Sequence, residues 1–461
     1  MYDTVIRAGM VIGEAGTAIA DIGIKDGRVA AVASGLAGHE VIDAAGKLVL
    51  PGAVDPHVHL AMPAGNLRSS DDWASGTIAA ACGGTTTVID FVEPGPGEPM
   101  LEALAARRAE ADGQAVIDFS LHMTVRPDEG SGRPGSAALA EVPDAVAAGC
   151  LSFKTYLTYE GLRLDDEGFL AAADAVGAAG GLLMVHAEND AGIAFLQRKL
   201  LAAGHRAPRF HPLARPAALE AEAIGQALAL AEITGCPLYV VHISTARGAR
   251  LVADARTRGQ AAWGETCPQY LLLTADEYAR PGFEGAKFVC SPPLRSSGDN
   301  AALWQELAGG ELSTVGTDHC PFFFEGEKSL GRDDFTAIPN GLPGIETRLA
   351  LIYTYGVGTG RFSLERWVES CCTAPAQLFG LYPRKGSLQP GSDADIVIFD
   401  PEEEVLLERD VLHEHVDYTP YDGRRLKGYP TMTLRRGHII YREGRFVGGS
   451  GGGQFVPGAR S

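Results

Sequence analysis

The chain lacks long apolar runs, paired cysteines and an excess of basic residues, and each absence excludes a class of protein. No apolar run approaches the roughly 20 residues of a membrane-spanning helix, so we expect no membrane partner. The eight cysteines form no Cys-x-x-Cys pair, which favours reduced thiols in a cytoplasmic protein without a signal peptide. The 39 Lys and Arg stand against 58 Asp and Glu, a formal net charge of −19, which argues against a nucleic-acid partner.

What is present is the composition of a globular protein, with 46% hydrophobic and 21% charged residues among 461. Residues 1 to about 50 alternate like short strands, and the same texture returns near the C-terminal end. We therefore expect both termini to form one β-sandwich domain, residues 1–52 and 383–446. The glycine-rich run at 448–453 predicts a flexible C-terminal tail over 447–461.

Between the two ends, strand-like runs alternate with helical stretches. The strand candidates are residues 54–60, 85–92, 117–125, 150–157, 181–188, 237–244, 261–268 and 313–320. Helical patterns cover residues 71–82, 100–111, 166–179, 217–234 and 245–257. Eight strands alternating with helices predict an α/β fold, a TIM-type (β/α)8 barrel over residues 53–382.

Metal-ligand residue types stand at the ends of several of these strands. His57 and His59 are two residues apart on the first strand and so face the same side. His186, His242 and Asp318 end the fifth, sixth and eighth strands. One such histidine alone is more often an ordinary core residue. Because the strand ends of this barrel converge on one rim, the whole set predicts a metal site.

Lys154, on the fourth strand, does not fit this pattern, because an ammonium group beside divalent cations is repelled. Either its side chain points elsewhere, or it is chemically changed. Carbamylation by CO2 would give a carboxylate-like group that could bridge two metal ions. The residues alone leave both possibilities open.

The chain resembles the dihydropyrimidinase and hydantoinase family of cyclic amidohydrolases over nearly its whole length. The matching motifs are residues 51–60, 83–87, 154–159, 185–189, 239–242, 290–295, 316–321, 331–336, 338–341 and 391–395. The resemblance implies a binuclear metal centre, usually of zinc, in a protein that is commonly a homotetramer. The implied ligands of one ion are His57, His59 and Asp318, those of the other are His186 and His242, and carbamylated Lys154 bridges both.

Two divalent ions sharing one water would lower its pKa and supply a bridging hydroxide to attack a ring amide. Asp318 can take the water's proton and pass it to the leaving nitrogen, besides being a ligand. The resemblance implies that Tyr159 stabilises the oxyanion, although a packed aromatic would explain the residue equally well. It also implies that backbone groups of Ser291 and Asn340 bind the imide edge of the ring.

The expected substrate is a small cyclic ureide or imide. We expect metal-dependent hydrolysis of a 5-substituted hydantoin or a dihydropyrimidine to an N-carbamoyl amino acid, with the D-enantiomer favoured. The alternatives are an allantoinase-like ureide hydrolase and a non-catalytic dihydropyrimidinase-like scaffold protein. The complete set of ligand-type residues argues against the scaffold protein.

Two small residues and four polar ones complete the predicted rim. Ala61 and Ala64 stand where relatives often carry Asp and Phe, which leaves the pocket for the ring substituent wider, or lined by other side chains, and its specificity open. The candidates for an outer layer around the ligands are Glu188, Asn189, His319 and Arg332.

Overall fold

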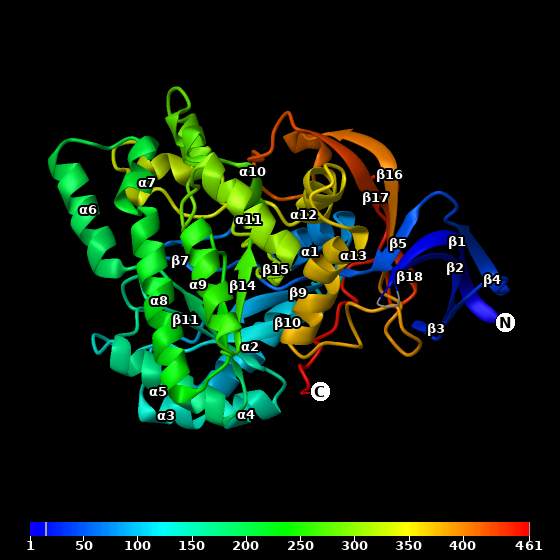
Figure 1. Ribbon diagram of the computed structural model, residues 1–461, viewed down its shortest axis with the longest axis horizontal. Helices are drawn as coiled ribbons and strands as arrows, with labels where there is room; N and C mark the ends of the chain where they lie inside the picture. Colours follow the sequence, from blue (N-terminus) through cyan, green and yellow to red (C-terminus); the bar gives the residue numbers. More distant parts are fainter. Residues whose placement is uncertain (14–15, 461) are drawn as a thin grey trace.

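The computed structural model describes residues 1–13 and 16–460. Figure 1 shows two parts side by side: a barrel surrounded by helices, and a β-sheet that combines the first strands of the chain with the last ones. Among the described residues, no helix is both long and apolar enough to cross a membrane.

The barrel contains eight parallel strands whose order in space follows their order in the chain. They are β6 (Ala53–Asp55), β9 (Thr85–Val92), β10 (Asp118–Thr124), β11 (Ser152–Tyr156), β12 (Leu182–His186), β13 (Leu238–Val240), β14 (Ala262–Thr266) and β15 (Thr314–Val315). Each lies within one residue of a predicted run or inside it, so the predicted α/β barrel is confirmed. The first, sixth and eighth strands are shorter than expected, because the chain leaves the ladder before reaching the ligand-type residues.

The barrel closes between its first and last strands through the residues that follow them. The Asp318 N–H donates to the His57 carbonyl at 2.9 Å, and the His59 N–H donates to the His319 carbonyl at 2.9 Å. Beneath them the buried guanidinium of Arg348 donates to the carbonyls of Val54 and Val315. The closing seam therefore runs through the residues expected to bind metal.

Helices cover the outside of the barrel, where the continuously apolar strands need a second buried face. The longer ones are α1 (Trp73–Cys82), α2 (Met100–Ala111), α5 (Asp166–Ala178), α6 (Asp190–Ala202), α8 (Ala217–Thr234), α9 (Ala246–Thr257) and α11 (Ser297–Gly309). Shorter ones are α3 (Ser136–Ala140), α4 (Val142–Ala147), α7 (His211–Ala214), α10 (Pro268–Leu272), α12 (Arg348–Ile352), α13 (Leu364–Val368) and α14 (Ala374–Leu378). All five predicted helices are present within two residues at either end, while α6 and α11 were not specified from the sequence.

The two chain ends pair with each other, as predicted, in one nine-stranded mixed sheet. Its strands are β1 (Tyr2–Gly13), β2 (Gly16–Lys25), β3 (Arg28–Ala33), β4 (Gly38–Asp43), β5 (Leu48–Pro51), β16 (Ile396–Leu406), β17 (Arg425–Arg435), β18 (His438–Arg442) and β19 (Arg445–Phe446). The join is the antiparallel pair of β5 and β16, in which Val49 is opposite Ile398. A separate two-residue hairpin, β7 (Pro63–Ala64) with β8 (Leu67–Arg68), follows the first barrel strand.

The C-terminal segment corrects the prediction of a flexible tail. The N–H of Phe119 donates to the Gln454 carbonyl, and the N–H of Val456 donates back to the Phe119 carbonyl. Val456 is buried, and the Arg108 guanidinium lies over the Phe455 ring. The glycine-rich run is therefore a short connection to a segment that packs against its own barrel, because the residues after it carry apolar side chains to bury.

Candidate metal centre and active site

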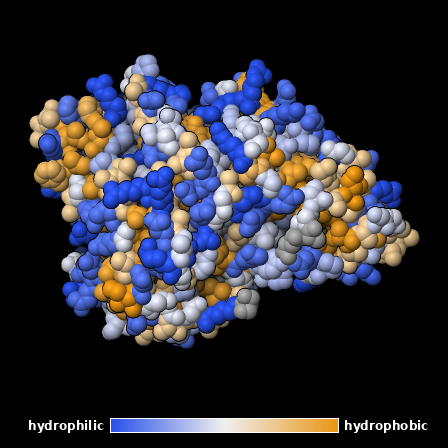
Figure 2. Space-filling view, in the orientation of Figure 1, coloured by the Kyte–Doolittle hydropathy of each residue, from blue (hydrophilic) through white to orange (hydrophobic). Residues whose placement is uncertain are grey.

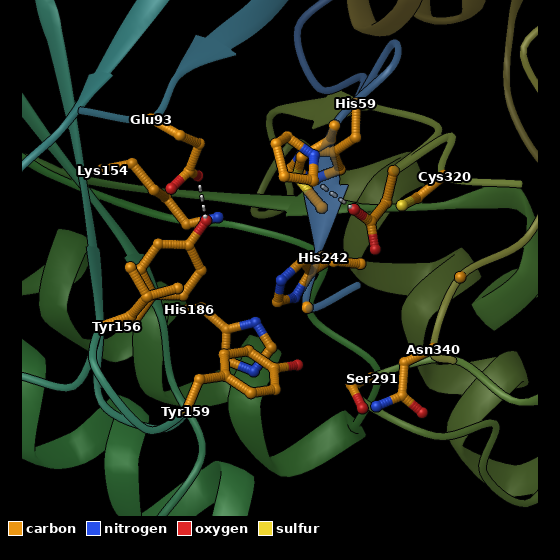
Figure 3. A pocket seen from close by; sticks show the side chains of 17 residues that line it. His59, Glu93, Lys154, Tyr156, Tyr159, His186, His242, Ser291, Cys320 and Asn340 are labelled. Carbon is orange, nitrogen blue, oxygen red and sulfur yellow. Dashed lines mark hydrogen bonds and ion pairs between the residues drawn. The ribbon is translucent and has the colours of Figure 1, made fainter. Parts of the chain in front are cut away.

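A cavity of about 330 Å³ opens at the C-terminal rim of the barrel. The predicted site residues are brought together here from segments more than 250 residues apart in the chain: His59, Lys154, Tyr159, His186, His242, Ser291, Asp318 and Asn340 all line it. His57 lies beneath the floor and is fully buried. Figure 3 shows the imidazoles grouped in the middle of this cavity, with Lys154 on one side and Asn340 on the other.

The first three predicted ligands form a compact group. Asp318 Oδ1 lies 3.1 Å from His59 Nε2 and 3.3 Å from His57 Nε2. Ligand atoms of the three residues all lie within 4.8 Å of one another. Two imidazoles and one carboxylate at this spacing are a donor set that suits zinc and similar divalent ions.

His186 and His242 lie next to this group. Their rings meet edge to face with centroids 4.5 Å apart, and His242 stacks on His57 at 5.4 Å. Burial lowers the pKa of all three rings, so they are neutral, which is the form that binds metal. His57 Nε2, His59 Nδ1 and His242 Nδ1 are buried without a hydrogen-bond partner among the described residues. Since buried polar atoms are normally paired, these atoms fit a bound ion.

Three site residues have strained backbones. The φ angles of His242, Asp318 and Tyr159 are 39°, 53° and 77°, in the left-handed region where a non-glycine residue costs about 1–3 kcal/mol. Each lies just after a barrel strand, where the turn redirects its side chain toward the cavity. Such strain persists where the surrounding structure imposes it, which is common at functional sites.

Glu265, in β14, was missed by the sequence reasoning. Its Oε1 accepts from His57 Nδ1 at 2.7 Å and from the His242 N–H at 3.1 Å, and Tyr239 donates to Oε2 at 2.8 Å. It thereby orients His57 Nε2 toward Asp318. A Cβ at Gly316 would lie 2.6 Å from Glu265 Oε2, which explains the glycine there. A carboxylate inside a predicted apolar strand was the available signal.

A second buried carboxylate orients His186. Glu188 Oε2 accepts from His186 Nε2 at 2.8 Å and is paired with the Arg215 guanidinium. Burial alone would raise the pKa of Glu188, but Arg215 and His186 outweigh it and lower that pKa to about 2. The interaction leaves His186 Nδ1 as the ring nitrogen available to a metal ion. Glu188 thus lies where an outer-layer role was predicted, and Arg215 was not foreseen.

Lys154 points into the cavity and is 1% exposed. Its Nζ lies 4.9 Å from the Phe91 ring centroid and 4.7 Å from that of Tyr156, and no ion pair to it is present in the described part of the chain. Burial lowers the pKa of Lys154 to about 8, although Asp318 and two glutamates oppose the shift. The Lys154 side chain is therefore directed into the cavity and is not turned away from it.

Tyr159 faces Ser291 and Asn340 across the cavity mouth. Its ring lies 5.0 Å from that of His186, and burial raises the pKa of its phenol, which therefore stays protonated and able to donate. The Asn340 Oδ1 atom is buried without a partner among the described residues. These positions are compatible with binding a polar ring.

A buried lysine joins the two loops that carry Ser291 and Asn340. Lys328 Nζ donates to the carbonyls of Val289 and Pro339, both at 3.0 Å. Burial lowers the pKa of Lys328 to about 7. The two loops are also joined directly, since the Gly341 N–H donates to the Val289 carbonyl.

Comparison with known proteins agrees with this geometry. The family described as "Amidohydrolase family" matches residues 48–440. A D-hydantoinase of Streptomyces coelicolor is 44% identical over 464 residues, covering 99% of this chain and 98% of the relative. A solved dihydropyrimidinase from Brevibacillus agri is 42% identical with a TM-score of 0.96, covering 99% of this chain and all of the other. The chain belongs to the hydantoinase and dihydropyrimidinase family of cyclic amidohydrolases.

A third relative widens the comparison. A solved L-hydantoinase (dihydropyrimidinase) from Arthrobacter aurescens is 34% identical, with a TM-score of 0.90 over 99% of this chain and all of that one. The chain is thus a cyclic amidohydrolase whose relatives include proteins named for either enantiomer.

The remaining predicted rim residues of this amidohydrolase lie outside the cavity. Asn189 caps α6 by accepting from the Gly192 N–H. His319 is buried on the far side of the closing seam, with Nε2 3.0 Å from Asp71. Arg332 is exposed, over the Phe283 ring. None of the three lines the cavity.

The loop after His59 contributes to the cavity wall, as expected. Ala64 lines the cavity together with Met62, and Tyr156 also lines it. Leu162 takes a place that the sequence analysis did not foresee. Glu93 and Cys320 are further lining residues with polar atoms that were not singled out from the sequence.

Proposed function

We propose that this amidohydrolase opens the ring of 5-substituted hydantoins or dihydropyrimidines and releases an N-carbamoyl amino acid. The observation that carries the proposal is the convergence of His57, His59 and Asp318 on one cavity, in a chain that matches a D-hydantoinase over 99% of its length. The greater identity to that relative than to the L-hydantoinase favours the D-enantiomer.

The proposed centre holds two divalent ions, with zinc the first candidate. His57, His59 and Asp318 would hold one, His186 and His242 the other, and carbamylated Lys154 would lie between them. The buried Lys154 side chain points at the ligand group and lacks an ion pair in the described structure, which supports this modification. Bound ions at such a site supply an activated water and polarise the scissile carbonyl.

The chain's own residues would complete the chemistry. Asp318 lies within 3.3 Å of two imidazoles and would take a proton from the attacking water, then deliver it to the leaving ring nitrogen. The Tyr159 phenol would donate to the carbonyl oxygen as negative charge develops there. Backbone groups of Ser291 and Asn340 would hold the imide edge of the ring.

Metal content tests the centre directly. We expect elemental analysis of purified protein to find about two ions per chain, as in other two-metal hydrolytic sites. Removing them with a chelator should abolish activity, and adding zinc should restore it. Active protein with well under one ion per chain would contradict the proposal.

A substrate panel tests the reaction. Among the described residues that line the cavity, Lys154 is the one Lys or Arg, so a ring bearing a carboxylate, such as dihydroorotate, would lack a free cationic partner. We expect a 5-substituted hydantoin or dihydrouracil to show the highest kcat/KM, with both hydantoin enantiomers measured. A tenfold advantage for allantoin or dihydroorotate, about 1.4 kcal/mol of transition-state preference, would contradict the assignment.

The remaining proposals concern organisation. We propose one domain of residues 1–52 with 383–446 and a second domain of residues 53–382. We also propose a cytoplasmic location, which the eight unpaired, buried cysteines support.

We also propose a homotetramer. Figure 2 shows an apolar patch at the end of the molecule where α6 lies, and Phe195 on α6 is 57% exposed. An exposed patch of this kind is typical of a protein interface.

A further inference from the structure

Glu93 is an acidic residue in the cavity wall that the proposed chemistry does not use. It directly follows β9 and is only partly buried. Its Oε1 accepts from the Tyr156 hydroxyl and from the Thr124 hydroxyl, both at 3.2 Å. No described residue donates to its other oxygen, Oε2. Figure 3 shows the Glu93 carboxylate beside Tyr156 and Lys154.

Glu93 lies on the side of the cavity opposite the proposed imide-binding loops. In Figure 3, Ser291 and Asn340 stand on one side of the histidines and Glu93 on the other. If those loops hold the imide edge of a hydantoin, ring carbon 5 is directed away from them. A substituent on that carbon would then extend toward Glu93.

A second cavity adjoins the first one at Glu93. Met62, Pro63 and Glu93 line both, and the second cavity has a volume of about 160 Å³ with Glu98 and Glu110 in its wall. Ala64, a small residue, also lines the first cavity.

The arginines that line the second cavity are either paired with other carboxylates or exposed at its edge. The Arg107 guanidinium is paired with Asp90 and Glu110, and Arg68 is an exposed residue of the second cavity. Lys154, the cation nearest the floor, is assigned to the metal centre. Glu93 is therefore left without a cation of its own in the proposed active form.

We infer that Glu93 recognises a positively charged group at the end of the ring substituent, so that the substrate class includes hydantoins with an aminoalkyl or guanidinoalkyl side chain. The inference rests on the proposed function and names its substituent specificity. A carboxylate oxygen that still lacks a donor forms a charge-assisted hydrogen bond with an ammonium or guanidinium group. An alkyl group of equal length would gain apolar contact with Met62 and leave that oxygen unpaired.

The test compares 5-(aminobutyl)hydantoin with 5-pentylhydantoin, which differ by an ammonium in place of a methyl group. We expect the wild-type kcat/KM to favour the aminobutyl compound by about tenfold, equivalent to about 1.4 kcal/mol. Glu93→Gln keeps an oxygen for Tyr156 and Thr124 but removes the charge. It should abolish that preference while leaving kcat/KM for the pentyl compound within about twofold.

Two control variants separate charge recognition from structural effects. Tyr156→Phe removes the hydroxyl that donates to Glu93 and leaves the carboxylate, so the preference should persist. Glu160→Gln removes one exposed negative charge near the cavity mouth, and the preference should again persist. A Glu93→Gln enzyme with an unchanged ratio, or a Tyr156→Phe enzyme that loses the ratio equally, would overturn the inference.

The outcomes also separate this inference from the proposed function. Efficient hydrolysis of 5-pentylhydantoin without any preference for the aminobutyl compound overturns the inference and leaves the function in place. Hydrolysis of neither compound by metal-loaded enzyme overturns both.

Discussion

At the scale of single residues, we expect substitution of Lys154 to have the largest effect on activity. It is a buried amine in the same cavity as the candidate metal-binding side chains. We predict that Lys154→Ala lowers kcat by about a hundredfold or more, since even outer-layer changes at metal sites cost ten- to a hundredfold. Added acetate or propionate should restore part of the activity by replacing the carbamate oxygens. Steady-state kinetics with and without the acid measure this, and a fully active Lys154→Arg enzyme would refute it.

Tyr159 allows a second prediction at the same scale. Its protonated phenol lies beside His186 and is proposed to donate only as the oxyanion forms. We predict that Tyr159→Phe lowers kcat by about 10²–10³-fold, as removing an oxyanion-hole donor does, with a much smaller change in KM. If KM rises while kcat stays constant, Tyr159 binds the ground state and the proposed role is wrong.

At the scale of elements, the cavity depends on how loops are joined. Lys328 bonds to Val289 and Pro339 and so holds together the loops of Ser291 and Asn340. We predict that Lys328→Met raises KM by roughly tenfold, with a smaller effect on kcat, because loosened loops lose binding shared by the ground and transition states.

The pH dependence of stability gives this lysine an independent readout. Its pKa in the folded protein is about 7, below that of an unfolded lysine, so the unfolded chain binds more protons between about pH 7 and pH 10. Stability from this group therefore rises with pH across that window. The thermal midpoint of the wild type, measured relative to that of Lys328→Met, should therefore rise between pH 7 and pH 9. A constant difference between the two would contradict a lowered pKa.

At the scale of the whole molecule, the exposed patch on α6 is expected to affect assembly, and the packed C-terminal segment is expected to affect stability. Phe195→Glu on the exposed patch of α6 should convert the proposed tetramer into smaller species with little loss of thermal stability.

Truncation after Val447 should instead lower the thermal midpoint, because burial of Val456 alone is worth about 2 kcal/mol. Light scattering and thermal unfolding of both variants measure the two effects. A monomeric wild-type protein would refute the assembly.

The sequence by itself determined the repeat of strands and helices, the pairing of the chain ends and the ligand-type residues at the strand ends. Those features follow from local patterns, since hydrophobic periodicity and strand-end position are readable along the chain. The position of Glu265 inside a predicted strand was a local signal that it is buried, but it did not show that the carboxylate orients His57. Glu93 follows its strand directly, and nothing local distinguishes it from an acidic side chain that faces solvent.

Only the tertiary structure decided those roles. The closing seam at His57 and Asp318 joins residues about 260 positions apart in the chain. The tail that packs beside Phe119, and Lys328 between two loops, depend likewise on contacts between distant segments. The fold decides which groups surround a buried lysine or carboxylate and whether one of them pairs with it. Desolvation and pairing act over a few ångströms of space and are independent of separation along the chain.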